Sequence, residues 1–145
     1  MLQACAIRNK PSDTMSREDK SHYESHSPLD LCGFEGFTES AAEHIIDEIR
    51  QPFIVCRIKG KITNDEGVWP ENLPILFEIR RTGKDSKTAQ ALADGNGTFE
   101  MPQMAEGRYC FKATVLGWRS VMGIIIVDKK ADPKRTILIN MLFGV

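Results

Sequence analysis

The residue types that carry catalysis or bind metals form few recognisable patterns in this chain. The three histidines, which are the side chains most often used as general bases at neutral pH, are His22, His26 and His44. His22 and His26 have the i, i+4 spacing of a two-imidazole metal site, with Cys32 downstream, but the polar residues around them indicate a tether rather than a rigid helix. The sequence has no Gly-x-Ser-x-Gly or His-Glu-x-x-His motif, and Gly95-Asn-Gly97 lacks the third glycine of a phosphate loop. The sequence therefore predicts no catalytic residues, no metal site and no cofactor.

The four cysteines are Cys5, Cys32, Cys56 and Cys110, and none of them forms a Cys-x-x-Cys pair. Alternation along its strand places Cys110 on the face opposite to its apolar neighbours Tyr109 and Phe111. That face is open to a covering segment, so a disulfide between Cys32 and Cys110 is a candidate that would fasten the N-terminal segment to the sheet. Free thiols are the alternative, because connectivity does not follow from sequence.

Cys5 is also a candidate for lipidation. Leu2-Gln-Ala-Cys5 resembles the last four residues of a bacterial lipoprotein signal, in which the cysteine receives the lipid. Such a signal normally contains an apolar stretch of roughly 7 to 15 residues before the cysteine. A chance match is the other interpretation of these four residues.

Length and composition favour one globular domain with an appendage. The chain has 145 residues, of which 41% are hydrophobic and 27% are charged. The formal net charge of −1 provides no overall field for phosphate backbones, so nucleic acid is not an expected partner. No apolar run approaches the roughly 20 residues of a membrane-spanning helix, so we expect contact with a membrane only through a lipid anchor.

Two elements are expected before the apolar half of the chain. Residues 1–37 are predicted to be an extended or disordered polar tether, because few of their side chains are apolar. Residues 38–51 are predicted to form an amphipathic helix. Ser40-Ala-Ala-Glu43 has the spacing of a capping box, and the sequence continues with an apolar series at helical spacing before Pro52 ends it. The members of that series are Ala42, Ile45, Ile46 and Ile49.

Residues 52–145 are predicted to be an all-β domain. Runs of β-branched and aromatic residues alternate with Gly, Pro, Asn and Asp turn signals about every ten residues, which is typical of a seven-stranded Greek-key β-sandwich. The predicted strands are 53–63, 75–81, 88–93, 98–101, 108–116, 120–128 and 135–142. Alternation assigns two residue sets to the core: Ile54, Cys56, Ile58 and Ile62 on the first strand, and Tyr109, Phe111, Ala113 and Val115 on the fifth.

A family resemblance rests on the order of several short motifs in this half. Together they resemble the carboxypeptidase regulatory-like domain, a transthyretin-like β-sandwich, over about residues 53–143. The resemblance implies a non-catalytic module, usually secreted or envelope-exposed. The motifs are Gly60-Lys-Ile-Thr-Asn-Asp-Glu-Gly67, Leu73-Pro-Ile-Leu-Phe-Glu-Ile79, Ala93-Asp-Gly-Asn-Gly-Thr-Phe99, Glu106-Gly-Arg-Tyr-Cys-Phe111 and Leu116-Gly-Trp118.

Three functions are weighed on this basis. The first is a non-enzymatic cell-envelope or extracellular module that binds a protein or carbohydrate, or that assembles with copies of itself by strand addition. The second is a small-ligand carrier with a pocket between the sandwich and the face of the predicted helix from Ala42 to Ile49. The third is a transthyretin-like hydrolase, which is disfavoured because the chain ends Met-Leu-Phe-Gly-Val145 instead of Tyr-Arg-Gly-Ser and all its histidines precede the sandwich.

Overall fold

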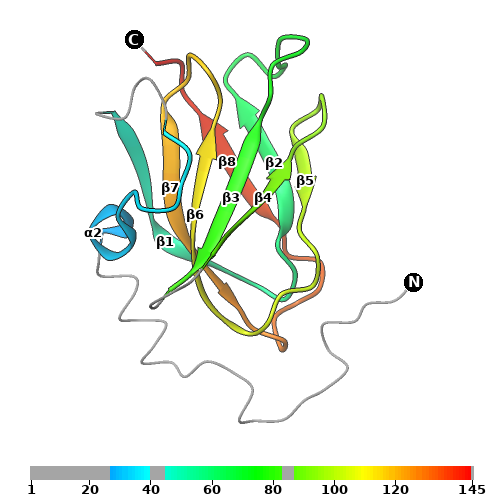
Figure 1. Cartoon of the computed structure of the whole chain (residues 1–145). Helices are drawn as coiled ribbons and strands as arrows, with labels where there is room; N and C mark the ends of the chain where they lie inside the picture. Colours follow the sequence, from blue (N-terminus) through cyan, green and yellow to red (C-terminus); the bar gives the residue numbers. More distant parts are fainter. Residues whose placement is uncertain (1–26, 40–44, 83–86, 145) are drawn as a thin grey trace.

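A computed structural model describes residues 27–39, 45–82 and 87–144. These residues form eight strands in two sheets and one short helix, so the prediction of a mostly β, sandwich-like fold is confirmed (Figure 1). None of the helical segments in the described ranges is long and apolar enough to cross a membrane. The elements are α2 (Pro28–Cys32), β1 (Ile46–Val55), β2 (Lys59–Asn64), β3 (Leu76–Arg81), β4 (Thr88–Leu92), β5 (Thr98–Glu100), β6 (Gly107–Thr114), β7 (Ser120–Val127) and β8 (Ile137–Met141).

The larger sheet has the strand order β1-β7-β6-β3-β4, and the smaller sheet has the order β5-β2-β8. Most neighbours are antiparallel, but β1 runs parallel to β7 and β2 runs parallel to β8. Because successive strands reverse direction, their connections collect at two opposite ends of the sandwich (Figure 1). Loops 65–75, 93–97, 115–119 and 142–144, with the strand residues that border them, define what we call the aromatic end. Loops 56–58, 101–106 and 128–136, residues 82 and 87, and the strand residues that border them define the basic end.

The main core fills the space between the two sheets. Phe77 from the larger sheet stacks on Phe99 from the smaller one, with ring centroids 4.1 Å apart, and also on Phe111, at 5.5 Å. The predicted core face of β6 is confirmed, since Tyr109, Phe111, Ala113 and Val115 all lie in this cluster. Burial of this alternating set explains why β6 keeps a single register between β3 and β7.

The prediction of a helix over residues 38–51 is wrong where the structure describes those residues, because Ile46 to Gln51 lie in β1. Residues 40–44, which carry the capping-box motif, lie outside the described residues. Ile46 packs on a cluster outside the larger sheet, whereas Ile49 packs on the main core. Their side chains therefore occupy opposite faces of a strand rather than one helical face. The spacing of the apolar residues in so short a segment fits a helix as well as a strand. Isoleucine favours strands, and pairing with the wholly buried β7 stabilises the strand.

The sandwich begins at Ile46 rather than at Pro52, and the strand predicted over 53–63 is two strands. The chain leaves the larger sheet after Val55, crosses between the layers at residues 56–58 and enters the smaller sheet at Lys59. Because of this crossing, the alternation of side chains between the two faces does not continue from β1 into β2. Ile54, predicted to share a face with Ile58 and Ile62, instead packs outside the larger sheet.

Candidate binding surface

Residues 27–39 lie as a strap across the outer face of the larger sheet, and a disulfide fastens them there (Figure 1). Cys32 at the end of α2 and Cys110 on β6 are joined with an S–S distance of 2.02 Å and a Cα–Cα distance of 6.0 Å. Part of the predicted polar tether is therefore ordered against the sheet. Apolar side chains seal the contact: Leu29, Leu31, Cys32 and Phe37 from the strap meet Ile46, Ile54, Cys110, Met122, Ile124 and Ile126 from the sheet.

Polar contacts hold the two ends of the strap. At its start, Ser27 Oγ and the Leu29 N–H donate to Glu48 Oε1 on β1, and these hydrogen bonds lower the pKa of the Glu48 carboxyl below its usual 4.5. At its end, the Thr38 N–H and hydroxyl donate to the buried Glu78 carboxylate, each at 3.0 Å, and the buried Lys112 ammonium donates to Thr38 O at 2.7 Å. The strap thus supplies partners for two charges that the sheet buries.

The other residues weighed for chemistry fall into two groups. Cys5, His22, His26 and His44 lie outside the described residues. Cys56 is buried and disulfide-bonded. Within the described ranges, no group of three His, Cys, Asp or Glu side chains is placed to hold a metal ion.

Exposed apolar side chains collect at the aromatic end. Of the seven large hydrophobic side chains that are exposed in the described part of the chain, five are at this end. The other two are Phe34 on the strap and Leu138 on β8. Single exposed apolar residues are ordinary, but a gathering of them marks an interaction surface. The five, with their exposed fractions, are Val68 (69%), Leu92 (70%), Leu116 (74%), Leu142 (36%) and Phe143 (64%).

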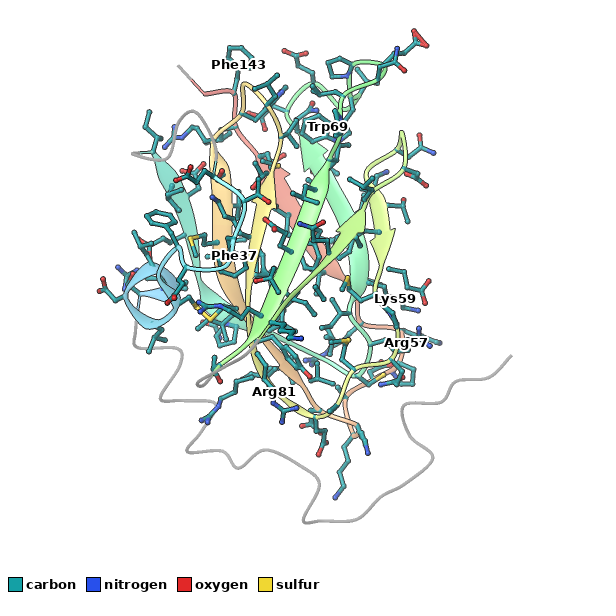
Figure 2. All side chains as sticks on the ribbon, viewed as in Figure 1. Phe37, Arg57, Lys59, Trp69, Arg81 and Phe143 are labelled. Atoms are coloured by element: carbon teal, nitrogen blue, oxygen red, sulfur yellow. A yellow bond between two sulfur atoms is a disulfide. The ribbon has the colours of Figure 1, made fainter. Side chains whose placement is uncertain are left out.

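A rigid ladder of rings supports this surface. Trp69 meets Trp118 edge to face, with centroids 4.9 Å apart, and Trp118 meets Phe143 in the same way at 5.3 Å. The Trp69 Nε1–H donates to Ile62 O at 2.8 Å, which fixes the indole to β2. Figure 2 shows Trp69 and Phe143 together at this end of the sandwich. The rings are therefore held in place before any partner arrives, which lowers the entropic cost of binding.

A groove of about 400 Å³ opens beside Trp69 between the β2–β3 loop and the end of β4. Its size is within the range of ligand sites, and it combines apolar walls with carboxylate and amide groups. The lining residues that bear on binding are Trp69, Glu71, Asn72, Leu73, Leu92 and Asp94.

Turn chemistry fixes the loops around the groove. The Gly97 N–H donates to Asp94 O at 2.8 Å with φ of 84° at Gly97, so residues 94–97 form a tight turn. The turn joins β4 to β5, which lie in different sheets, so it is not the turn of a β-hairpin. A Cβ on Gly97 would lie 2.0 Å from Ile62 O, so only glycine fits there. Asn64 Oδ1 accepts from the N–H groups of Glu66 and Gly67, both at 2.9 Å.

The charges at the two ends have opposite signs. In the described loops of the aromatic end the acidic residues are Asp65, Glu66, Glu71 and Asp94, and the only basic one, Arg119, is paired with Asp47 on β1 at 2.9 Å. The basic end carries an excess of cations, toward which Arg57, Lys59 and Arg81 lie in Figure 2. Its basic residues are Arg57, Lys59, Arg81, Lys87, Lys129, Lys130, Lys134 and Arg135, against Glu100, Glu106, Asp128 and Asp132.

Some of the basic-end side chains have partners within the chain. Arg57 pairs with Glu100 at 2.8 Å, and Arg81 donates to Glu106 O at 2.7 Å while its guanidinium lies 5.7 Å from the Tyr109 ring centroid. Burial raises the pKa of the Tyr109 phenol, against the opposing effect of Arg81. Of these contacts, only the Arg57–Glu100 pair neutralises a cation with a carboxylate, because Arg81 donates to the backbone carbonyl of Glu106.

No protein-family model matches this chain, and a comparison with curated proteins found no match in sequence. The sequence analysis identified neither of the two end surfaces. The signal for them was present, because β strands that reverse direction put alternate loops at opposite ends, and the loop charges could have been sorted on that basis.

Proposed function

We propose that this protein is a non-enzymatic β-sandwich module of the cell envelope or extracellular space that binds a macromolecular partner through its aromatic end. The observation that carries the proposal is the concentration of exposed apolar side chains over the Trp69–Trp118–Phe143 ladder. A surface that only faced water would have no need of so many large apolar groups at one end. The acidic rim supplies orientation and specificity around that apolar centre.

The proposed location is supported by the disulfides. The Cys32–Cys110 bond and the disulfide at Cys56 are of a kind that persists in oxidising compartments and is rare in the cytosol. Lipidation of Cys5 would anchor such a module to a membrane. One sulfur cannot hold both a thioether-linked lipid and a disulfide, so peptide mapping without reduction tests the anchor. A Cys5–Cys56 disulfide peptide would remove it.

We further propose that the sandwich is a transthyretin-like domain of the carboxypeptidase regulatory-like kind, with Greek-key connectivity. Support comes from the strands found at or next to most of the predicted ranges and from the glycine turns at Gly67 and Gly97. A solved structure with a different strand connectivity in residues 53–143 would refute this assignment.

A small-ligand carrier is the second candidate function, and the groove beside Trp69 favours it. The pocket first expected, between a helix and the sandwich, does not exist in that form because Ile46 and Ile49 belong to β1. A carrier would show saturable binding of a small molecule that quenches Trp69 fluorescence. The hydrolase is the least supported candidate, because the described ranges contain no histidine.

The experiment that tests the binding proposal compares two matched surface changes. Fluorescently labelled full chain is screened on printed arrays of bacterial and host glycans and on a phage-displayed peptide library. Leu116→Ser/Phe143→Ser removes two exposed apolar groups from the aromatic end, and Leu138→Ser removes an equally exposed one from β8. We expect a ligand of the wild type to be retained by Leu138→Ser and weakened at least about tenfold by the double variant. Ligands that the double variant binds as tightly as the wild type would refute the proposal.

A further inference from the structure

We infer that copies of this chain associate head to tail, with the aromatic end of one copy seated on the basic end of the next. The inference rests on the proposed function, because it takes the aromatic end as the binding surface and names a second copy as its partner. Its basis is the segregation of charge between the two sets of loops. The net charge of −1 hides this segregation, which becomes visible only once the topology assigns each loop to an end.

The two ends act as separate electrostatic surfaces. They are separated by the length of the strands, and β7 alone, with its eight residues, spans on the order of 25 Å. This distance exceeds the screening length of about 8 Å at physiological ionic strength, so the charges of one end do not cancel those of the other. An approaching copy therefore meets an acidic face or a basic face rather than a neutral average.

The side-chain chemistry of the two ends is complementary beyond the sign of charge. Lys130 and Lys134 are exposed at the basic end, and their aliphatic stems can cover the apolar groups of a neighbour while their ammonium groups reach its carboxylates. On the aromatic end, Glu66 and Glu71 are exposed around the apolar centre. The exposed Phe143 ring adds an acceptor for a cation–π contact.

The same charges select the geometry of association. Two aromatic ends brought together would oppose acidic rims, and two basic ends would oppose lysines and arginines, so both symmetric arrangements are repulsive. The attractive arrangement joins unlike surfaces. Such a heterologous contact leaves one free aromatic end and one free basic end on every growing assembly, which produces open chains rather than closed dimers.

Two variants that each block one end provide the test. Glu66→Lys/Glu71→Lys blocks the aromatic end, and Lys130→Glu/Lys134→Glu blocks the basic end. All four side chains are exposed. Hydrogen bonds recorded at Glu66, Lys130 and Lys134 involve only their backbone N–H groups, so the turns should survive. Asp94 is left unchanged because its carboxylate holds the β4–β5 turn. Glu35→Lys on the strap and Lys61→Glu on β2, both exposed and outside the loops that define the two ends, serve as controls with the same kinds of charge change.

Sedimentation velocity of the full chain gives the readout over a range of concentrations, at about 50 mM and about 500 mM salt. We expect the wild type and both controls to form species larger than the 16.3 kDa monomer at low salt and to dissociate at high salt. Each end-blocked variant alone should weaken association at least about tenfold. An equimolar mixture of the two should form a dimer of twice the monomer mass and nothing larger, because only one productive contact remains.

Three outcomes would overturn the inference. The first is a wild type that stays monomeric at low salt. The second is an end-blocked variant that associates as the wild type does, and the third is a mixture that gives no dimer. Circular dichroism and thermal unfolding must show that the variants are folded. Failure here is separable from failure of the proposed function. A monomeric wild type whose array ligand is lost in Leu116→Ser/Phe143→Ser would refute self-association and leave the binding surface in place.

Discussion

Replacing Cys32 and Cys110 by alanine should remove a large part of the stability of this domain. The disulfide closes a loop with a sequence separation of 78 residues. In the chain-entropy description, restoring the freedom of a loop of this size to the unfolded chain costs about 4.5 kcal/mol of folding free energy. A domain of this size is typically stable by about 5–15 kcal/mol, so the loss is a substantial fraction of the total. Alanine is preferred to serine because Cys110 lies in an apolar cluster, where a new hydroxyl would add its own cost.

Urea unfolding of the wild type and of Cys32→Ala/Cys110→Ala, followed by tryptophan fluorescence and by circular dichroism, measures the difference. We expect a decrease of about 3–5 kcal/mol in the free energy of unfolding. Adding reductant to the wild type is a poor substitute, because Cys56 is disulfide-bonded as well. A decrease below about 1 kcal/mol would refute the reasoning. It would mean that the unfolded chain without the disulfide keeps enough residual structure to restrict this loop, so that the bond removes little of its freedom.

Three other perturbations test the packing of the core and of the strap. A Cβ on Gly60 would lie 1.8 Å from Ile137 O, whereas a Cβ on Gly95 would meet nothing within 4 Å. In thermal unfolding, Gly60→Ala should therefore lower the stability by more than about 3 kcal/mol and Gly95→Ala by less than about 1 kcal/mol. Equal effects of the two substitutions would contradict the β2–β8 register. Lys112→Met leaves Thr38 O without the Lys112 donor and should cost about 2 kcal/mol in urea unfolding, and an unchanged midpoint would show that this hydrogen bond adds no net stability. Because the folded-state pKa of Glu48 is lowered, the stability from its contacts with Ser27 and Leu29 is complete above about pH 4.5 and is lost as pH falls through the folded-state value. The measurement is hydrogen exchange at the Leu29 amide, expressed relative to the intrinsic exchange rate at each pH. In the wild type this relative rate should increase on acidification, and in Glu48→Gln it should not depend on pH.

The β domain was predictable wherever alternation and turn chemistry agreed. The strand that contains Tyr109 and Phe111 is apolar on its core face, and that face was found as predicted. The strand was predicted over 108–116 and covers Gly107–Thr114. The prediction failed at β1, which is a strand because it pairs with β7. β1 includes three charged residues near its start. Residues Ile46 to Gln51 carry no local signal of their buried parallel partner, which begins 74 residues later at Ser120. Long-range parallel pairing leaves little trace in a short window.

The position of the strap on the sheet was also not predictable from its own residues. Its residues read as a polar tether because only Leu29, Leu31, Phe34 and Phe37 stand out among charged and small neighbours. Three of these, Leu29, Leu31 and Phe37, pack in the outer cluster, where the disulfide and the hydrogen bonds of Thr38 to Glu78 and Lys112 hold the segment on the sheet. A buried carboxylate and a buried ammonium on adjacent strands would have been a useful sequence signal. Charged residues inside an otherwise apolar strand call for a covering segment that supplies polar partners.

The aromatic end also separates residues that maintain the fold from residues available to a partner. The three rings of the ladder differ in exposure: Trp118 exposes 9% of its surface and Phe143 64%, while Trp69 is half-buried and bonded to Ile62 O. Replacing Trp69 or Trp118 would therefore disturb packing and binding together, and a loss of binding would have two explanations. Leu116 and Phe143 expose most of their surface, so their replacement changes what a partner meets at little cost to the core. This is why the binding and assembly experiments rest on exposed residues, and why the two tryptophans are better read as the rigid support on which those residues are presented.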